Sequence, residues 1–197
     1  MSTKKEILEL AKRNNGSVTY QDVVKEGIHS EYLRLMVEEG TLDKSGRGQY
    51  VLRDSMIDDM ETLQKRYGRG VFSHESALFL LGFSDRTPIE HVMTFPRKYN
   101  ITSPSSNGIK TYRVNEKTYN LGIITTETQF QHVVRTYSIE RTLCDLLRPN
   151  SKVSTEIITD AFKQYSRSNN KNLIQLMEYA KTFHVEEKVR TYMEVLL

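Results

Sequence analysis

The stretch that decides the fold is residues 41–52, which read Thr41-Leu42-Asp43-Lys44-Ser45-Gly46-Arg47-Gly48-Gln49-Tyr50-Val51-Leu52. The Ser45-Gly46 pair predicts a tight turn flanked by Lys44 and Arg47, and the alternating residues after it predict a strand that returns to the core. Arg47 stands between two glycines, so no neighbouring side chain shields it. An arginine at such a place suits a phosphate or a narrow minor groove of DNA. The stretch is therefore predicted to be a basic hairpin that contacts nucleic acid.

Three short helices are predicted before this hairpin, and two of them precede Gly27. Thr3 begins the first helix, and Glu6, three residues on, completes a capping box. The sequence Asn14-Asn15-Gly16 ends this helix. Thr19 then caps the second helix, which carries Val23 and Val24.

A third helix follows Gly27, which is free to adopt a positive φ in the turn between two helices. This helix starts at His29 or Ser30, runs to about Glu39 and ends at Gly40. Its predicted core residues are Leu33, Met36 and Val37, and its other face presents Ser30, Glu31 and Arg34, with Tyr32 and Leu35 near the edge. One interpretation is a three-helix bundle whose third helix has a solvated face. The basic hairpin favours the other interpretation, a winged helix-turn-helix that places this helix in the major groove.

Beyond residue 53 the pattern changes. Residues 54–70 predict a connector helix with Met56, Met60 and Leu63 on one side, and residues 71–197 predict a second domain that opens with a helix capped by Ser73. The predicted strands are 91–95, 109–114, 119–125 and 131–136, and the predicted later helices are 139–147, 155–167, 172–182 and 186–197. The expected fold class is α+β: an N-terminal winged helix-turn-helix over residues 1–53, plus a C-terminal domain with a small sheet followed by a helical bundle.

The composition excludes several classes of protein. The 197 residues, 38% hydrophobic and 27% charged, are enough for one large domain or two ordinary ones. The net charge is +3, with nine Lys/Arg against eight Asp/Glu in residues 1–53 and 19 against 17 in the rest, so binding of nucleic acid must use local patches. One cysteine forms no internal disulfide, and no apolar run has the length of a membrane span. We expect a cytoplasmic protein without membrane contact.

No constellation in the sequence supports catalysis. Ser73-His74-Glu75 contains a nucleophile, a base and a carboxylate, but adjacent helical residues do not face one another as the members of a triad must. The five histidines are spread singly and Cys144 stands alone, so the paired ligand spacings of a zinc site are missing. Gly68-x-Gly70 lacks the glycine spacing of a phosphate-binding loop. We therefore predict that the protein is not an enzyme and uses no cofactor or metal.

One segment of the second domain is unusually basic. Between Pro96 and Asn120, five Lys and Arg residues stand against a single acid, Glu116. Together with the basic end of the connector they form a predicted second basic surface: Lys65, Arg66, Arg69, Arg97, Lys98, Lys110, Arg113 and Lys117. Lys110 and Arg113 lie on opposite faces of one strand, so the whole set cannot share one face. The segment is either a sheet edge that Lys and Arg guard against self-pairing or a binding face for DNA phosphate or an acidic partner.

Three blocks of sequence, in order along the chain, resemble the AbiEi antitoxin family. The family's N-terminal winged helix-turn-helix is matched by Gly27-Ile28, Leu33, Met36-Val37, Gly40-x-Leu42 and Gly46-Arg47-Gly48-Gln49-Tyr50. The opening of its second domain is matched by Ser73-His74-Glu75-Ser76-Ala77-Leu78 and Leu81-Gly82-Phe83-Ser84-Asp85-Arg86-Thr87-Pro88. A later helix is matched by Tyr137-Ser138-Ile139-Glu140-Arg141-Thr142-Leu143-Cys144-Asp145.

The resemblance implies an antitoxin of a bacterial type IV toxin-antitoxin operon for abortive phage infection. Its first domain would bind inverted repeats in the promoter of its own operon and repress transcription. Its second domain would neutralise a nucleotidyltransferase-like toxin encoded beside it, with no stable toxin complex required. This chain departs from the family at the third helix, where His29 and Leu35 fill positions that are often basic and Glu31 adds a negative charge. Arg34 is left as the main cation of that helix. We therefore expect more of the DNA contact to come from Lys44 and Arg47 on the hairpin.

The predicted DNA-binding residues lie on the third helix, at the start of the second helix and on the hairpin. On the third helix, Ser30, Tyr32 and Arg34 reach base edges. At the start of the second helix, Thr19 and Tyr20 contact phosphate. On the hairpin, Lys44 and Arg47 contact the flank of the site. We expect a monomer in solution and two copies on double-stranded DNA, because an inverted repeat doubles the contact area. The alternatives are a stand-alone winged-helix transcriptional regulator whose C-terminal domain senses a ligand or partner, and an enzyme that modifies the toxin.

Overall fold

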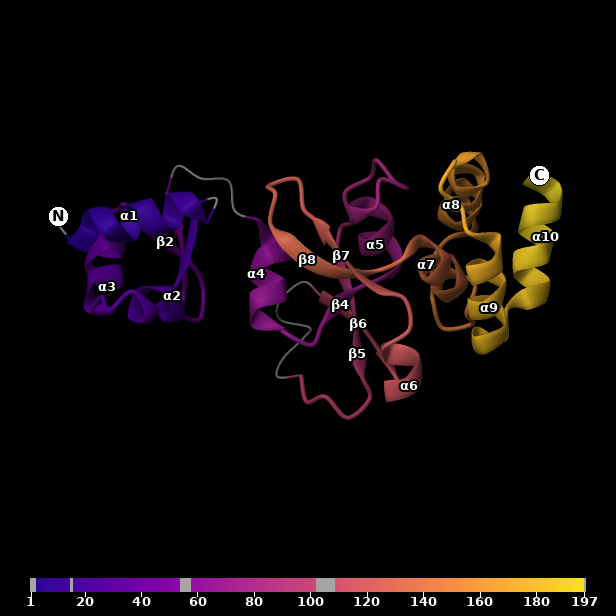
Figure 1. Cartoon of the computed structure of the whole chain (residues 1–197), viewed down its shortest axis with the longest axis horizontal. Helices are drawn as coiled ribbons and strands as arrows, with labels where there is room; N and C mark the ends of the chain where they lie inside the picture. The colour runs from indigo at the N-terminus through magenta and orange to yellow at the C-terminus, as the bar shows by residue number, and fades with distance from the viewer. Residues whose placement is uncertain (1–2, 15, 54–57, 102–108, 197) are drawn as a thin grey trace. The chain divides into compact units, whose positions relative to one another are not determined.

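The computed structural model describes residues 3–14, 16–53, 58–101 and 109–196. The chain divides into two compact units. Unit 1 consists of residues 1–66 and 128–132, and unit 2 consists of residues 67–127 and 133–197. Each unit combines helices with a sheet (Figure 1). The predicted α+β class, with an N-terminal helix-turn-helix and a C-terminal domain, is therefore confirmed.

Unit 1 contains a winged helix-turn-helix and one further helix. In chain order its elements are α1 (Thr3–Arg13), β1 (Ser17–Thr19), α2 (Tyr20–Lys25), α3 (Glu31–Glu38), β2 (Leu42–Gly46), β3 (Gln49–Leu52) and α4 (Asp59–Arg66). The strands form an antiparallel sheet in the order β1-β3-β2, with β2 and β3 as the wing. The first three helices and the sheet all contribute to one apolar core: Ile7, Leu10, Ala11, Val18, Val23, Ile28, Leu33, Met36 and Leu42.

The wing turns later than the sequence predicted. Strand β2 continues through Ser45 to Gly46, which pairs with Gln49, so the turn is Arg47-Gly48 rather than Ser45-Gly46. Gly48 has a φ of +70°, a conformation that a side chain disfavours, whereas Gly46 has no positive φ. The shift places Arg47 at the tip of the wing itself.

The helices of unit 1 differ from the expected ones in two details. Val24 is 49% exposed, because neighbouring positions of a helix point about 100° apart and Val23 takes the buried one. Helix α3 begins at Glu31, and Ser30 precedes it without a capping bond from its side chain. The predicted core residues Leu33 and Met36 are fully buried, and Val37 is partly buried against the same core, so the inward face of α3 was predicted correctly.

The helix after the wing is shorter than the predicted range of 54–70. It covers Asp59–Arg66, and residues 54–57, including Met56, lie outside the described residues. Asp58 caps it, since its Oδ1 accepts hydrogen bonds from the backbone N–H groups of Met60 at 3.0 Å and Glu61 at 3.2 Å. Met60 and Leu63 are buried on one side of α4, as the sequence predicted.

Unit 2 is built on a mixed five-stranded sheet. Its strands are β4 (Val71–Phe72), β5 (His91–Pro96), β6 (Ile109–Val114), β7 (Ile123–Glu127) and β8 (Val133–Tyr137), in the order β6-β5-β4-β8-β7. The β5–β6 and β4–β8 pairs are parallel, and the other pairs are antiparallel. The strand expected over 119–125 starts only at Ile123, because Asn115 caps a short helix, α6 (Glu116–Tyr119), by accepting from the N–H of Thr118 at 2.8 Å.

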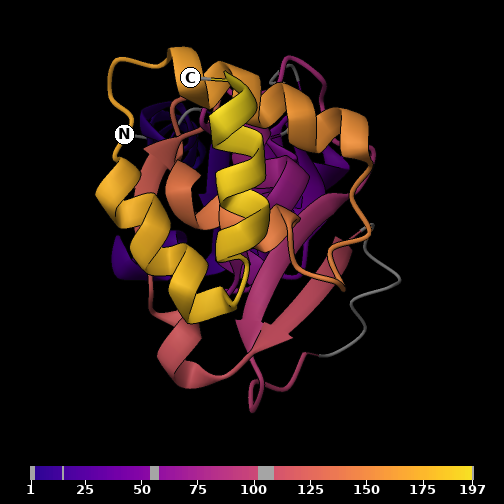
Figure 2. The ribbon, with the colours of Figure 1, turned by 90° about the vertical axis from the view of Figure 1, so that its right-hand side faces the viewer.

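Further helices form a second core, and the first of them packs on the sheet. They are α5 (His74–Leu80), α7 (Ile139–Leu146), α8 (Thr155–Arg167), α9 (Leu173–Phe183) and α10 (Glu186–Leu196). The last of them lies against both α8 and α9 (Figure 2). Their buried side chains form one cluster that includes Leu78, Leu143, Phe162, Leu176 and Val189. No helix in the described part of the chain is both long and apolar enough to cross a membrane.

Candidate nucleic-acid interface

The start of α2 is fixed by a reciprocal cap. The Oγ1 of Thr19 accepts from the N–H of Asp22 at 3.1 Å, and the Oδ2 of Asp22 accepts from the N–H of Thr19 at 2.9 Å and from its hydroxyl at 2.6 Å. A serine or threonine followed three residues later by an acid produces this capping box. The hydroxyl proton of Thr19 is therefore donated to Asp22. The side chain of Tyr20, the next residue, is exposed, and its hydroxyl makes no hydrogen bond among the described residues.

The tip of the wing is joined to the start of α2. The backbone N–H of Tyr20 donates to the carbonyl oxygen of Gly48 at 2.8 Å. A Cβ on Gly48 would lie 3.5 Å from the Cβ of Tyr20, in ordinary contact, so the positive φ rather than crowding favours glycine here. This bond brings Arg47 and Tyr20 to the same rim. Lys44 and Arg47 are exposed, and within the described ranges neither has an ion-pair partner.

A polar hollow of about 690 Å³ lies between the wing tip, the start of α2 and α4. We call it the wing hollow, and its lining residues are Thr19, Tyr20, Gln21, Asp22, Arg47, Gly48, Gln49 and Lys65. Two cations, Arg47 and Lys65, face one acid, Asp22, whose carboxylate is already engaged in the cap. The hollow thus offers donors and positive charge, which is the chemistry that an oxyanion needs.

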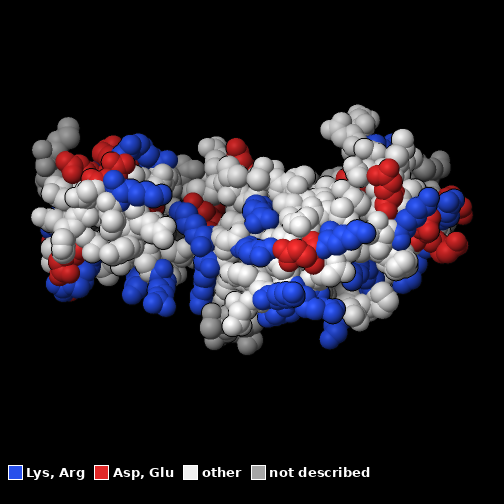
Figure 3. Space-filling view, turned by 60° about the horizontal axis from the view of Figure 1, so that its bottom comes forward, with Lys and Arg blue, Asp and Glu red and all other residues white. Residues whose placement is uncertain are grey.

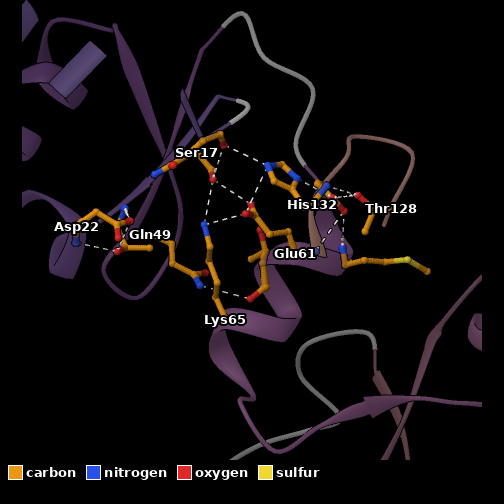
Figure 4. A network of polar contacts seen from close by, with 12 residues as sticks. Ser17, Asp22, Gln49, Glu61, Lys65, Thr128 and His132 are labelled. Atoms are coloured by element: carbon orange, nitrogen blue, oxygen red, sulfur yellow. Dashed lines mark hydrogen bonds and ion pairs between the residues drawn. The ribbon is translucent and has the colours of Figure 1, made fainter. Parts of the chain in front are cut away.

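Helix α4 positions Lys65 in this hollow. The Nζ of Lys65 lies 2.9 Å from the Oε1 of Glu61 and donates to the Oγ of Ser17 at 3.0 Å, and Ser17 in turn donates to Glu61 at 2.9 Å. The amide of Gln49 donates to the carbonyl oxygen of Thr62 at 3.4 Å, which ties α4 to the wing as well (Figure 4). These bonds hold α4 against both β1 and β3.

A buried imidazole extends the same network. The Nδ1 of His132 lies 2.9 Å from the Oδ2 of Asp58, which also accepts from the hydroxyl of Thr128. The Nε2 of His132 lies 3.1 Å from the carbonyl oxygen of Asn14 and 3.4 Å from Glu61 (Figure 4). His132 and Asp58 are both buried, so the loop 128–132 is part of what supports α4. Sequence reasoning missed this cluster because His132 and Asp58 are 74 positions apart and no motif joins them.

The exposed face of α3 is acidic, in contrast to the wing hollow. Arg34 bonds Glu31 through its Nε at 2.7 Å and through a terminal nitrogen, and it also pairs with Glu38. This hydrogen bond from Arg34 holds the pKa of the Glu31 carboxyl below its usual range, although Glu31 is exposed, and the pKa of Arg34 is raised in turn. Two acids therefore stand against one cation. Of the other two residues predicted to reach bases, Ser30 is half-buried and Tyr32 packs partly against the core.

The predicted second basic surface is divided by the fold. Lys65 and Arg66 belong to unit 1, whereas the other six residues belong to unit 2. On β6, Lys110 lies 3.8 Å from Glu75 of α5, while Arg113 points the other way and donates to the carbonyl oxygens of Arg97 and Tyr99. Lys110 thus lies apart from the others, as the strand alternation predicted.

The five remaining cations of unit 2 are all exposed, and we call them its basic face: Arg69, Arg97, Lys98, Arg113 and Lys117. Figure 3 shows Lys and Arg side chains gathered over α6 and the adjoining loops. Arg69 pairs with Glu116, the one acid of the segment, so that pair is electrically neutral. Arg97, Lys98 and Lys117 are exposed and have no ion-pair partner in the part of the chain that the structure describes.

The Ser73-His74 pair is packed rather than poised for catalysis. Ser73 is completely buried, accepts from the hydroxyl of Thr94 at 2.8 Å and lies 3.1 Å from the Nδ1 of His74. Burial lowers the pKa of His74 to about 4, so this imidazole is neutral. The hydroxyl of Ser73, expected to cap α5, makes no capping bond. Among the described residues, no three His, Cys, Asp or Glu side chains are grouped to hold a metal ion.

Comparisons with known proteins bear on both units. Residues 5–53 match the family described as "Transcriptional regulator, AbiEi antitoxin", which is not a class of enzymes. The crystal structure of the RV2827C protein from Mycobacterium tuberculosis superimposes with a TM-score of 0.56 at 12% identity, over 98% of this chain and 81% of that one, which is a likeness of fold. No sequence match was found among proteins with curated descriptions. The resemblance predicted from the sequence is therefore confirmed, and the winged helix of this chain is similar to that of the AbiEi antitoxin transcriptional regulators.

Proposed function

We propose that this chain is an antitoxin of a type IV toxin-antitoxin system. It represses its own operon by binding inverted repeats in promoter DNA, and it neutralises a nucleotidyltransferase-like toxin encoded beside it. In this proposal residues 1–53 are the DNA-binding domain, 54–70 the connector and 71–197 the antitoxin domain. The observation that carries it is the wing tip: Arg47 is exposed beside Tyr20, within the segment that matches the AbiEi regulators.

The wing hollow supplies the contacts to the DNA backbone. Arg47 and Lys65 bring positive charge to one hollow, and Tyr20 adds a phenolic hydroxyl at its edge. Lys44, exposed on β2, extends the same contact along the wing. Phosphate contacts of this kind fix the register of the protein on the duplex without reading sequence. Thr19 takes part by positioning Tyr20, because its own hydroxyl is engaged in the cap.

Helix α3 supplies the contacts to the bases. Its residues Tyr32 and Arg34, with Ser30 just before it, enter the major groove in the manner of a recognition helix. Arg34 must first leave Glu31 and Glu38, and such exposed ion pairs within a helix are weak and open readily. A guanine offers Arg34 two acceptors in place of the two carboxylates.

The basic face of unit 2 is a second contact in this proposal. Arg97, Lys98 and Lys117 have the charge and exposure to bind DNA phosphate beyond the operator half-site. The double variant K98A/K117A should leave binding to a duplex of one half-site unchanged. On the whole promoter, the slope of log affinity against log salt should become shallower by about 2. An unchanged slope on the whole promoter would remove this face from the DNA-binding surface.

The test of DNA binding is a gel shift with the promoter of the chain's own operon. Wild type should bind as two copies, with the affinity falling steeply between about 50 mM and about 200 mM salt. Arg47→Ala should weaken binding to any sequence and make the salt slope shallower by about 1. Lys12→Ala is the matched control, because it removes one exposed charge from α1 outside the wing hollow. Equal loss in both variants, or none in Arg47→Ala, contradicts the assignment of the wing.

The test of toxin neutralisation is co-expression with the adjacent gene. Wild type should relieve the growth arrest that the toxin causes. Arg47→Ala should also relieve it from an independent promoter, since neutralisation is assigned to the second domain. Failure of wild type to relieve arrest would favour a stand-alone transcriptional regulator. A covalent mass increase on toxin recovered from these cells would favour an enzyme instead.

A further inference from the structure

Unit 2 contains a pocket that the proposed function does not use. It has a volume of about 450 Å³ and lies between α5, the segment 84–90, β6 and the first turn of α8. Its walls are mainly apolar and include Leu78, Pro88, Ile89, Val92 and Ile157. Pockets of about 300–1,000 Å³ with apolar walls and a few polar groups are typical of small-molecule sites.

The polar group of interest in this pocket is the carboxylate of Glu75. Its Oε1 lies 3.8 Å from the Nζ of Lys110, which is an ion-pair distance but too long for a hydrogen bond. Its Oε2 is buried and has no hydrogen-bond partner in the described part of the chain. A buried acceptor left unpaired costs about 1–3 kcal/mol, more when it is charged. The pocket thus contains an acceptor that a ligand with a donor would satisfy.

The rim of the pocket adds two observations. Ile89 is fully exposed, which is unusual for a large apolar side chain, and it stands at the edge of the apolar walls. A ligand seated in the pocket would cover part of it. Among the charged residues of the lining, Arg86 is paired with Glu156, which leaves Glu75 and Glu90 against Lys110 alone. The unpaired charge of the lining is therefore negative and favours a cation.

We propose that this pocket binds a small organic ammonium: an apolar body of roughly ten heavy atoms with an N–H-bearing cationic head. The body lies against Leu78, Val92 and Ile157, and the head donates to the Oε2 of Glu75. This site is independent of the DNA-binding surface, because it shares no residue with the wing hollow. It gives the second domain a ligand in addition to the toxin assigned to it.

The test uses two probes that share a ring and a charge, and in the second of them methyl groups replace the N–H donors. The probes are 2-phenylethylamine, protonated at neutral pH, and its N,N,N-trimethyl analogue, which has no N–H. Each is titrated into the full ¹⁵N-labelled chain while amide chemical shifts are followed. 2-Phenylethylamine should shift the amides of residues 75–92 and 110, and the trimethyl analogue should bind about tenfold more weakly. Equal binding of both probes, or shifts elsewhere only, overturns the proposal.

Two variants and one control locate the effect. Glu75→Gln should weaken 2-phenylethylamine binding about tenfold, while Glu127→Gln, which removes an exposed acid on β7, should leave binding unchanged. Ile89→Ser changes a side chain that is already fully exposed, so it cannot unfold the domain, and it should weaken binding about threefold. Wild-type affinity in both Glu75→Gln and Ile89→Ser rules the pocket out. Gel shift and growth rescue in Glu75→Gln should match wild type, so failure here is distinct from failure of the proposed function.

Discussion

The wing and helix α3 present cations to solvent in opposite ways. On α3, Arg34 lies between two glutamates at helical spacing, so its charge is more than cancelled on that face. On the wing, Lys44 and Arg47 are exposed without acidic partners in the described residues, and the one acid of β2, Asp43, is paired with Arg53. Both regions belong to the same small module. The affinity of this module for DNA is therefore expected to come from the wing.

The comparison shows why a count of cations along the chain is a poor guide to a binding face. The winged helix has a charge of only +1, yet that charge is unevenly distributed. An acid three or four positions from an arginine on a helix neutralises it, whereas a turn between two glycines isolates it. To read a base, Arg34 on α3 must exchange its two carboxylate partners for the edge of that base. The wing needs no such exchange to bind phosphate.

Charge reversal on the wing should have the largest effect on DNA affinity. The double variant K44E/R47E replaces two unpaired cations with acids. It should lower affinity for any duplex about 100-fold at about 50 mM salt. The reason is that binding releases fewer counterions from the DNA when phosphate contacts are lost. Fluorescence anisotropy with operator and unrelated DNA measures both affinities. The matched variant R34E on α3 should reduce operator binding and leave unrelated DNA nearly unaffected. A larger loss on unrelated DNA for R34E than for K44E/R47E would reverse the comparison.

Removal of the acids on α3 should raise the affinity for DNA instead of lowering it. In E31Q/E38Q the guanidinium of Arg34 loses both carboxylates, and two negative charges leave the face that approaches the groove. Affinity for unrelated DNA should rise about five- to tenfold at low salt, and the preference for operator over unrelated DNA should fall. The control is Glu9→Gln on α1, whose partner Lys12 lies outside the wing hollow. No gain in E31Q/E38Q would mean that α3 does not approach the phosphates.

Much of the DNA-binding module could be predicted from local sequence. Thr19 caps α2 as expected, because the whole motif lies within four residues, and Asp22 makes that cap reciprocal. The pairing of Arg34 could also have been predicted, since Glu31 and Glu38 stand at the i,i+3 and i,i+4 spacings that bring side chains together. The turn of the wing was misplaced by two residues because Ser45-Gly46 and Arg47-Gly48 are both plausible turns. Only strand pairing across the hairpin decides between them.

Features that depend on distant segments could not be predicted. The network of Asp58, Thr128 and His132 joins residues about seventy positions apart, and nothing in the sequence marks them as partners. Strand β4 has two residues, too few for a periodic pattern, yet it joins the two halves of the second sheet. The pocket beside Glu75 depends on β6 and α8, which lie 35 and about 80 residues further along the chain.

The network behind the wing should have a moderate effect, on stability rather than on specificity. Asp58→Ala leaves the imidazole of His132 without its carboxylate and removes the cap of α4. Loss of one member of a buried pair and of a helix cap should lower the free energy of unfolding of unit 1 by about 2–4 kcal/mol. Urea unfolding followed by circular dichroism measures it. Affinity for DNA, measured where the variant is folded, should change less than twofold. A large affinity loss in folded protein would mean that Asp58 acts on the wing directly.

The smallest effect expected is that of Lys65, the third cation available to the wing. Unlike Arg47, it is half-committed, because its Nζ already contacts Glu61 and Ser17. Lys65→Met keeps the length of the side chain and removes the charge, so α4 stays packed while the wing hollow loses one donor. Affinity for any DNA should fall about threefold, less than for a free phosphate contact, and the salt slope should become shallower by less than 1. Lys12→Met on α1 controls for the general loss of one charge. If Lys65→Met weakens binding as much as Arg47→Ala does, the ion pair between Lys65 and Glu61 does not persist on DNA. Lys65 would then make a phosphate contact as strong as that of Arg47, rather than a weaker one.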